Sequence, residues 1–441
     1  MLSATEESGA AVAEDISRLT EHLFREESGK LVSVLTGLFG IERLQLAEDV
    51  VQEALVRALR TWPYYGIPNN PAAWITQTAK NLALDLLRRE KFFRDRQSDI
   101  AVSVEQWSSD SAAGDLPQFD TEIRDNRLRL FFACCHPMIP PESQIALALK
   151  TLCGFSPAEI AKAFLTTEAA ISKRLTRTRQ KIRDLRIPFE IPSGPEFSSR
   201  LDGVLQTIYL LFNEGYKASS GEDLIREDLC HEAIRLALLL VEHPPADLPR
   251  THALVALMLL DSARLPARVD ADGNILRLQE QDRSKWNRAL IDRGISHLGR
   301  SAAGEELSEY HLQAGISACH SLAANYESTD WPHILSLYDH WINLNRSPVV
   351  ALNRAVAVAN VRGPAAGIEA IQAIIARRQL KSYYLLYAVL GEFEARLNHL
   401  DAAIAQFQRA LALTELKSEQ IFLSKRIELL RQQITDTNSR A

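Results

Sequence analysis

Cysteine pairs, long apolar runs and an excess of positive charge are all missing from this chain. Its 441 residues include 5 cysteines, an odd number without a Cys-x-x-Cys pair, so the sequence predicts neither a disulfide framework nor a zinc site. No run of about 18 uncharged apolar residues is present to span a membrane. The first residues, MLSATEESGAAVAED, lack the basic and apolar regions of a secretory signal. We therefore expect a cytoplasmic protein with no membrane segment, no metal and no cofactor.

The formal net charge is −6, which argues against a generic nucleic-acid binder. Positive charge is nevertheless concentrated in one short stretch between Ile171 and Arg186, where Asp184 is the only acid. The basic residues there are Lys173, Arg174, Arg177, Arg179, Lys181, Arg183 and Arg186. A local basic stripe on an acidic protein indicates a focused contact with DNA.

Residues 46–90 predict two amphipathic helices around a short polar loop. The first has an apolar stripe at helical spacing and a polar face that carries Asp49, Gln52 and Glu53, and Pro63 is expected to end it. Its stripe consists of Leu46, Val50, Ala54, Leu55, Ala58, Leu59 and Trp62. Two further helices, residues 12–28 and 29–39, are expected before this pair.

The second helix of the pair is expected to begin with Asn70 as its N-cap and Pro71 at its first position. It would bury Ile75, Ala79, Leu82 and Leu86. Its polar face would present Trp74, Gln77, Asn81, Asp85 and Arg88 at steps of three and four residues. An indole, two amides and a guanidinium on one face could hold an unstacked nucleic-acid strand by stacking and hydrogen bonding.

A helix-turn-helix is predicted further along the chain. Helices over residues 123–135 and 142–153 precede a Ser156–Glu159 capping box, which starts a short helix. After a tight turn, a long helix runs from Thr167 to about Leu185 with Ile171, Leu175 and Ile182 on its buried side. Two helices across a tight turn, the second one basic, are typical of this DNA-binding motif.

The composition of the rest of the chain predicts a linker and a helical C-terminal part. Residues 91–121 mix Ser, Asp, Gly and Pro without a sustained period, which predicts a linker. A second Pro/Gly-rich boundary at 186–196 leads into residues 196–433, which read as amphipathic helices without strand signals. One segment matches a tetratricopeptide repeat at Tyr387, Leu390, Gly391, Ala403, Phe407 and Ala410, with a weaker copy about 36 residues earlier. We expect an all-α protein that ends in a tetratricopeptide-like α-solenoid.

Residues 12–90 and 122–187 resemble regions 2 and 4 of extracytoplasmic-function (ECF) sigma factors, in the sigma-70 superfamily. The resemblance implies that Asp49, Gln52 and Glu53 bind core RNA polymerase. It implies contact with the promoter −10 element by Trp74, Gln77, Asn81, Arg88 and Arg89. Near the −35 element, Glu168, Ser172, Lys173 and Thr176 would face the bases, and Arg174, Arg177, Arg179 and Lys181 the phosphates. Leu165 stands in the turn where Gly is common.

The C-terminal half resembles the extension of one ECF group, which carries a tetratricopeptide-like domain. The matching runs are Phe212–Tyr216, Asp228–Arg235, Gln281–Trp286, His311–Ala314 and Ser347–Val358. The resemblance implies a sigma factor whose extension regulates its activity and could bind a protein or peptide partner.

Two other interpretations remain open from the residues alone. A helix-turn-helix regulator with a repeat-type sensor domain would bind operators as a dimer without polymerase, but it leaves residues 46–90 unexplained. An enzyme in the helical half is disfavoured, because no nucleophile–base or carboxylate constellation stands out. His231-Glu232 lacks the second His of a zincin motif.

Overall fold

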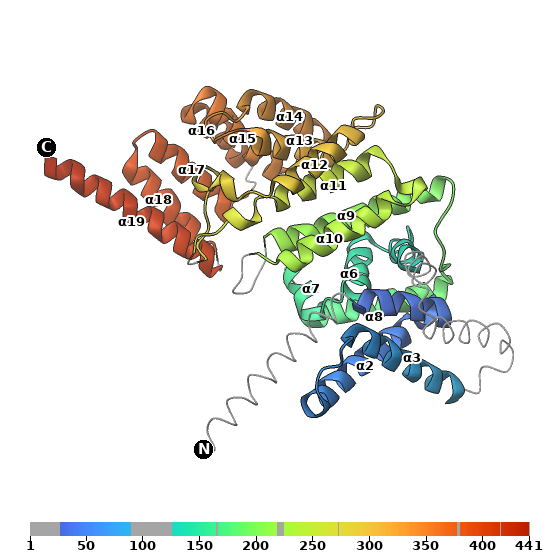
Figure 1. The fold of residues 1–441 in the computed structure, drawn as a ribbon. Coiled ribbons are helices and arrows are strands. Elements are labelled where there is room, and N and C mark those ends of the chain that lie inside the picture. Colours follow the sequence, from blue (N-terminus) through green and yellow to red (C-terminus); the bar gives the residue numbers. More distant parts are fainter. Residues whose placement is uncertain are drawn as a thin grey trace, which may run out of the picture. The chain divides into compact units, whose positions relative to one another are not determined.

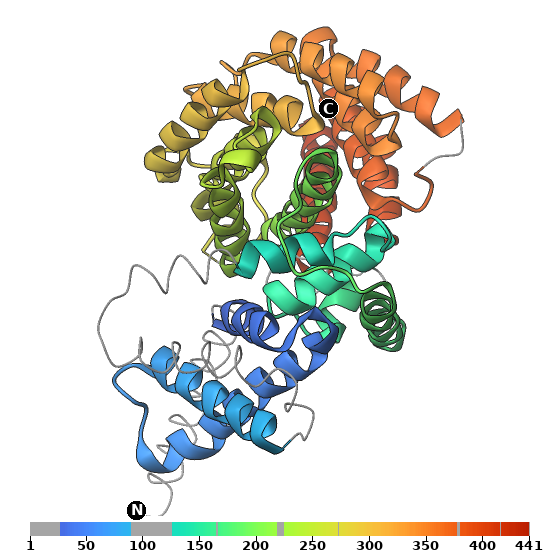
Figure 2. The same ribbon diagram turned by 90° about the vertical axis from the view of Figure 1, so that its right-hand side faces the viewer.

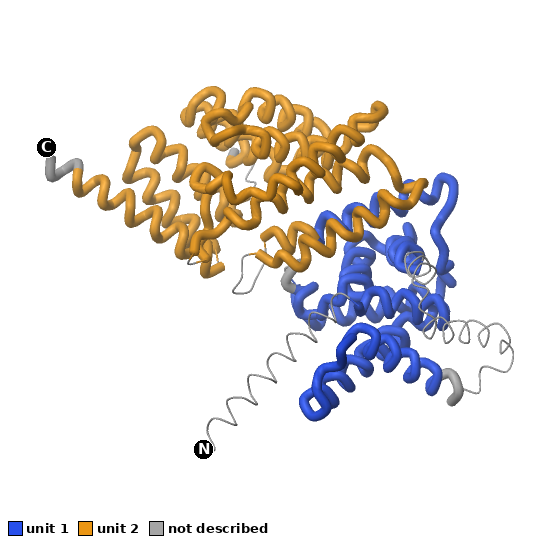
Figure 3. The backbone as a smooth tube through the Cα atoms, in the orientation of Figure 1, with its two compact units in different colours: residues 1–211 blue, residues 212–441 orange. Residues whose placement is uncertain are grey.

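The computed structural model describes residues 27–89, 126–164, 166–217, 225–271, 273–376, 380–414 and 416–440 (Figure 1). Within these ranges the protein is all-α, as the sequence predicts, and has no β-strand; one isolated bridge pairs Val269 with Ile275. The chain forms two compact units, Met1–Leu211 and Phe212–Ala441, coloured separately in Figure 3. Residues 12–26 of the first predicted domain and the predicted linker 91–121 lie outside the described residues.

Unit 1 is built from helices that belong to both expected DNA-binding domains. Residues 27–39 and 126–134 are helical. The remaining elements are η1 (Ile41–Arg43), α2 (Leu44–Tyr65), α3 (Pro71–Arg89), α6 (Pro141–Leu152), α7 (Pro157–Ala163), α8 (Glu168–Leu185) and most of α9 (Pro195–Tyr216).

Two predicted helix boundaries in unit 1 are wrong. The break expected between Ser28 and Gly29 is absent, because residues 27–39 form one uninterrupted helix. Pro63 does not end α2, which continues to Tyr65 and closes where the Gly66 N–H donates to the Trp62 carbonyl at 2.9 Å. Since Pro63 is in the last turn, its missing N–H removes a single bond at an exposed position.

Helix α9 packs most of its length into unit 1. Phe197, Leu201, Val204, Leu205 and Ile208 are all buried, and the ring of Phe197 lies 5.1 Å from that of Phe132. A Cβ at Gly203 would come within 3.4 Å of the Cβ of Cys135, so this helix fits closely against residues 126–135. The sequence placed the start of the C-terminal domain at 196, whereas the division between the two units falls within α9, after Leu211.

Unit 2 is a succession of helices that pack mostly against their neighbours in sequence, along an arc visible in Figure 2. They are α10 (Glu227–Val241), α11 (Pro249–Ser262), α12 (Arg288–Ser301), α13 (Glu309–Leu322), α14 (Trp331–Leu344), α15 (Pro348–Arg362), α16 (Pro364–Ala376), α17 (Tyr384–Arg396), α18 (Leu400–Leu411) and α19 (Lys417–Arg440). Short 3-10 helices lie at Pro244–Ala246, Leu265–Ala267, Leu278–Glu280 and Arg283–Lys285.

The six residues that match a tetratricopeptide repeat all lie on α17 and α18. Tyr387, Leu390, Ala403, Phe407 and Ala410 are buried in one cluster. A Cβ at Gly391 would lie 3.0 Å from the ring of Phe407, which is why the closest point of this helix pair carries a glycine. The packing agrees with the pattern, and the wider assignment of unit 2 to this repeat class stays a prediction.

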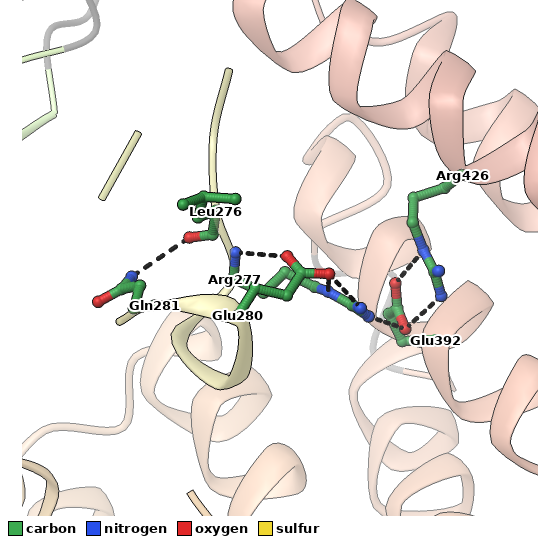
Figure 4. A network of polar contacts seen from close by, with 6 residues as sticks. All are labelled: Leu276, Arg277, Glu280, Gln281, Glu392 and Arg426. Atoms are coloured by element: carbon green, nitrogen blue, oxygen red, sulfur yellow. Dashed lines mark hydrogen bonds and ion pairs between the residues drawn. The ribbon is translucent and has the colours of Figure 1, made fainter. Parts of the chain in front are cut away.

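Two polar bridges within unit 2 join its early residues to its last helices. Glu392 on α17 lies between the guanidinium groups of Arg277 and Arg426, at 2.9 Å from each (Figure 4). Arg277 belongs to the loop between α11 and α12, so the loop is fastened to α17 and α19. At the end of α9, the Lys217 ammonium lies 2.7 Å from the buried carboxylate of Glu419 on α19. These contacts therefore join the first part of unit 2 to its last helices.

Candidate nucleic-acid interface

The three residues expected to bind polymerase form a patch on the outer face of α2. Asp49, Gln52 and Glu53 are all exposed, and Glu53 makes an exposed ion pair with Arg57 at 3.1 Å. The opposite face of the helix is core, with Val50, Ala54, Leu55, Ala58 and Trp62 buried. Leu59, which the sequence assigned to that core, is 42% exposed, and Leu46 is half-buried. The patch is therefore free to contact a partner without disturbing the fold of α2.

Helix α3 begins as predicted. The Ala73 N–H donates to the Asn70 side-chain oxygen at 3.0 Å, and Pro71 occupies the first helical position, where no N–H is needed. Ile75 and Ala79 are fully buried, and Ala83 is buried beside them. The expected core positions Leu82 and Leu86 are only half-buried.

The polar face of α3 that was expected to hold a nucleic-acid strand is only partly as predicted. Gln77 and Asn81 are exposed and share a hydrogen bond of 3.1 Å between their amides. Trp74 is half-buried, because its ring packs edge-on against Trp62 at 5.6 Å. That packing fixes one edge of the indole. Arg88 and Arg89 occupy the last turn of α3, and their side chains lie outside the described part.

A pair of exposed aromatic residues at the end of α2 was missed by the sequence reading. Tyr64 and Tyr65, at the end of α2, are 85% and 86% exposed. Flat rings held in water at the mouth of the α2–α3 loop are suited to stacking on unpaired bases. Two adjacent tyrosines followed by Gly66 could have drawn attention in the sequence, but the expected helix end at Pro63 placed them in an unspecified loop.

The helix-turn-helix has the predicted local geometry. Ser156 and Glu159 form the reciprocal capping box, with the Glu159 N–H donating to the Ser156 hydroxyl at 3.2 Å and the Ser156 N–H donating to the Glu159 carboxylate at 2.8 Å. Thr167 caps α8 by accepting from the Ala170 N–H at 3.2 Å. The apolar side of α8, with Ile171, Leu175 and Ile182, is buried. Leu165, in the turn, lies outside the described residues.

The residues expected to read the −35 element fall into two groups. Glu168, Ser172, Lys173, Thr176 and Arg177 are exposed along one side of α8, and Lys181 is half-exposed. Arg174 and Arg179 are engaged within the protein. The Arg174 guanidinium pairs with Glu142 at 3.0 Å and lies over the Phe164 ring at 5.6 Å.

Arg179 departs most from the expectation of a phosphate contact. Its guanidinium donates to the carboxylate of Glu48 at 2.6 Å, and its side chain is 12% exposed. Glu48 is on α2 and is itself buried, and burial raises the pKa of its carboxyl, against the opposing effects of Arg179 and Lys150. The sequence reading overlooked Glu48 because its partner is 131 residues away.

Metal clusters and reactive thiols are the usual marks of other kinds of functional site. No cluster of three or more His, Cys, Asp or Glu side chains in the described ranges could hold a metal ion. Burial raises the pKa of the Cys134 thiol to about 12 and raises that of Cys135 as well, so neither is a nucleophile at neutral pH. None of the described helices combines the length and apolarity needed to cross a lipid bilayer.

A capped helix-turn-helix with a basic outer side, together with a second helix that exposes two amides, is typical of a DNA-binding protein. Comparison with known families agrees. Residues 23–93 match sigma-70 region 2, and residues 132–182 match sigma-70 region 4. Residues 200–302 match a family of unknown function, DUF6596.

Similarity over most of the chain is found to the uncharacterized protein R00370 of Rhizobium meliloti, which is 38% identical over 88% of this chain and 90% of its own length. The ECF RNA polymerase sigma factor SigE of Mycolicibacterium smegmatis is 27% identical over 31% of this chain and 51% of its own. The probable RNA polymerase sigma factor RfaY of Xanthomonas campestris is 29% identical over 31% of this chain and 33% of its own. No solved structure matches.

The chain belongs to the same family as R00370 of R. meliloti, and within it residues 23–93 and 132–182 are sigma-70 region 2 and region 4 domains.

Proposed function

We propose that this protein is a detachable specificity subunit of the ECF type, which binds core RNA polymerase and directs initiation at promoters with −35 and −10 elements. One observation supports the proposal: an exposed acidic patch on α2 is combined, in the same chain, with two separate helices, α3 and α8, that expose polar side chains suited to contact with DNA. A regulator that binds operators alone needs neither the patch nor the amide face of α3.

The roles follow from the exposure of the side chains. Asp49, Gln52 and Glu53 would contact a basic surface of the polymerase. Gln77 and Asn81 would hydrogen-bond bases of the melted −10 strand, with Trp74 and the last-turn arginines Arg88 and Arg89 beside them. The exposed positions near the start of α8, Glu168, Ser172, Lys173 and Thr176, would lie in the major groove of the −35 element, with Arg177 on its phosphates.

The C-terminal extension is proposed to be a tetratricopeptide-like domain that supports the work of the sigma regions. The buried packing of α17 against α18 favours this class of repeat. Such domains bind protein or peptide segments on their helical surfaces. Because Arg277–Glu392 and Lys217–Glu419 close the arc, we expect a partner to bind the outer helices, or to bind after these pairs open.

Charge reversal of the α2 patch tests the proposal. The double variant Asp49→Lys/Glu53→Lys should fold normally, because both side chains are exposed and the Glu53–Arg57 pair contributes only about 0.3–0.5 kcal/mol. It should lose co-purification with core polymerase. The matched control, Asp292→Lys/Asp401→Lys, makes the same change of charge at two exposed positions of unit 2 and should bind normally. Binding that survives in the α2 variant would remove the patch from the interface.

A further inference from the structure

Two arginines and a histidine gather where α11, α12 and α13 of unit 2 pack together (Figure 1). Arg264 lies two residues beyond α11, Arg283 begins the 3-10 helix that precedes α12, and His320 is in the last turn of α13. The buried Trp286 joins these elements, because it packs in one cluster with residues of α11 and with Ala318 of α13. Arg264, Arg283, Trp286 and His320 are called the arginine cluster below.

The guanidinium of Arg283 is fixed by the main chain and by an indole. Its Nη1 donates to the carbonyl oxygens of His320 at 2.5 Å and Ala323 at 2.7 Å, at the end of α13. Its Cζ lies 4.6 Å from the centroid of the Trp286 ring, which is a cation–π contact. Among the described residues no carboxylate forms an ion pair with Arg283, and Glu327, which acts on it at longer range, is exposed. The guanidinium is therefore held in one place without a carboxylate in contact with it.

Positive charge exceeds negative charge around the cluster. Arg264 pairs with Asp261 at 2.8 Å and also donates to the Tyr216 hydroxyl at 2.8 Å. The guanidinium of Arg268 lies 3.7 Å from the centroid of the same tyrosine ring and donates to the Tyr216 carbonyl. Together with Arg283, three guanidinium groups in this described region are balanced by one carboxylate in direct contact. Positive charge taken partly out of water is unfavourable unless an anion offsets it.

One nitrogen of each side chain in the arginine cluster has no hydrogen-bond partner among the described residues. These atoms, all shielded from water, are Nε of Arg264, Nη2 of Arg283, Nε1 of Trp286 and Nδ1 of His320. Buried polar groups are rarely left unpaired, because each has lost its hydrogen bond to water. The imidazole is neutral at pH 7, since burial and the charges of Arg264 and Arg283 lower the pKa of His320 to about 3. The cluster therefore combines excess positive charge with polar nitrogens that require partners, and an anion with several acceptor oxygens meets both needs.

We propose that the arginine cluster binds a small anion that carries a phosphoryl group. Such a group has about two negative charges at neutral pH and three acceptor oxygens, which match the two guanidinium charges in excess and the N–H groups of the cluster. An acidic peptide fits less well, because only 13% of the Arg264 side chain is exposed. Arg283 and His320 are partly exposed, so a small anion reaches them from solvent when their side chains rotate. The site belongs to unit 2 alone and does not depend on the proposed function.

Calorimetric titration of the full chain with sodium phosphate, at an ionic strength held constant with sodium chloride, tests the site. The wild-type chain should bind phosphate. Arg283→Gln should weaken this binding by about 10–100-fold, which is the usual effect of losing one charged hydrogen-bond donor. The matched control, Arg346→Gln, removes the same charge from an exposed residue of unit 2 and should bind phosphate as the wild type does.

A second variant changes affinity in the opposite direction. Asp261→Asn keeps an oxygen that accepts from Arg264 but removes the negative charge, so it should bind phosphate more tightly than the wild type. Damage to the fold does not tighten binding, and this variant therefore tests the site even if Arg283→Gln misfolds. Circular dichroism of each variant shows whether it is folded.

Two further titrations identify the ligand class. Phenyl phosphate that binds more tightly than phosphate would indicate a phosphate monoester, and equal binding would indicate free phosphate. Acetate should bind more weakly than either, and acetate binding as tight as that of phosphate would contradict the choice of a phosphoryl group. The site is overturned if the wild type binds neither phosphate nor phenyl phosphate, if folded Arg283→Gln binds normally, or if folded Asp261→Asn binds more weakly. Because no polymerase is present, these results leave the proposed function standing.

Discussion

Neighbouring residues on α2 illustrate what a sequence can and cannot show about single side chains. The helical period correctly predicted that Asp49, Gln52 and Glu53 face outward, because it depends on the spacing of local apolar residues. It gave no sign that Glu48, one position earlier, is buried against Arg179. A partner 131 residues away leaves no local periodicity, so such a pair becomes visible only in the folded chain.

At the residue scale, base contacts by Asn81 and phosphate contacts by Arg177 should give different effects in mutants. Asn81→Ala should impair open-complex formation on duplex promoters and be partly rescued by a pre-melted bubble, because base capture matters only once the strand is unstacked. Arg177→Ala should weaken duplex binding at all sequences alike and lower the salt slope by about 0.9. Equal losses for Asn81→Ala on bubble and duplex templates would contradict its role.

At the scale of elements, helix starts were predicted better than domain limits. The caps predicted at Asn70 and Ser156 are local hydrogen bonds, and both are confirmed. The Pro/Gly boundary at 186–196 was read as a division between domains. The structure instead continues unit 1 into α9, because the apolar side of α9 completes the core around Phe132. A Pro/Gly-rich segment marks a turn in the chain, but tertiary packing decides whether the helix after it belongs to the same domain.

The shared helix predicts different behaviour for two truncations. A chain ending at Glu190 lacks Phe197, Leu201, Val204, Leu205 and Ile208, which are buried in unit 1. At about 1.5–3 kcal/mol for each side chain, the loss is about 7–15 kcal/mol, as large as the whole stability of a typical domain. Fragment 1–190 should therefore aggregate or melt without cooperativity, whereas fragment 1–211 should fold, as thermal melts monitored by circular dichroism would show.

Fragment 1–211 also tests the role of the extension. If unit 2 supports polymerase engagement, as proposed, this fragment should be folded and less active in transcription than the full chain. A folded fragment with greater activity would mean that the extension restrains the factor. A cooperatively folding 1–190 fragment with full activity would contradict both the packing argument and the supporting role.

At the scale of the whole molecule, the sequence predicted the all-helical class and the two sigma regions, and the structure and the family matches confirm them. Contacts between distant segments were not predictable. The Arg277–Glu392 and Lys217–Glu419 pairs each join parts of unit 2 that are 115 or more residues apart in the chain. Repeat patterns describe how neighbouring helices pair, and they carry no information on where the first and last helices meet.

Run-off transcription with purified core polymerase and a library of randomised promoters tests the central claim most directly. The account predicts transcripts only when core and this chain are both present, from templates that share two motifs at a fixed separation upstream of the start. Asp49→Lys/Glu53→Lys should abolish these transcripts, and the Asp292→Lys/Asp401→Lys control should preserve them. Polymerase-independent binding of a dimer to palindromic sites, with no dependence of transcription on the added chain, would contradict the account.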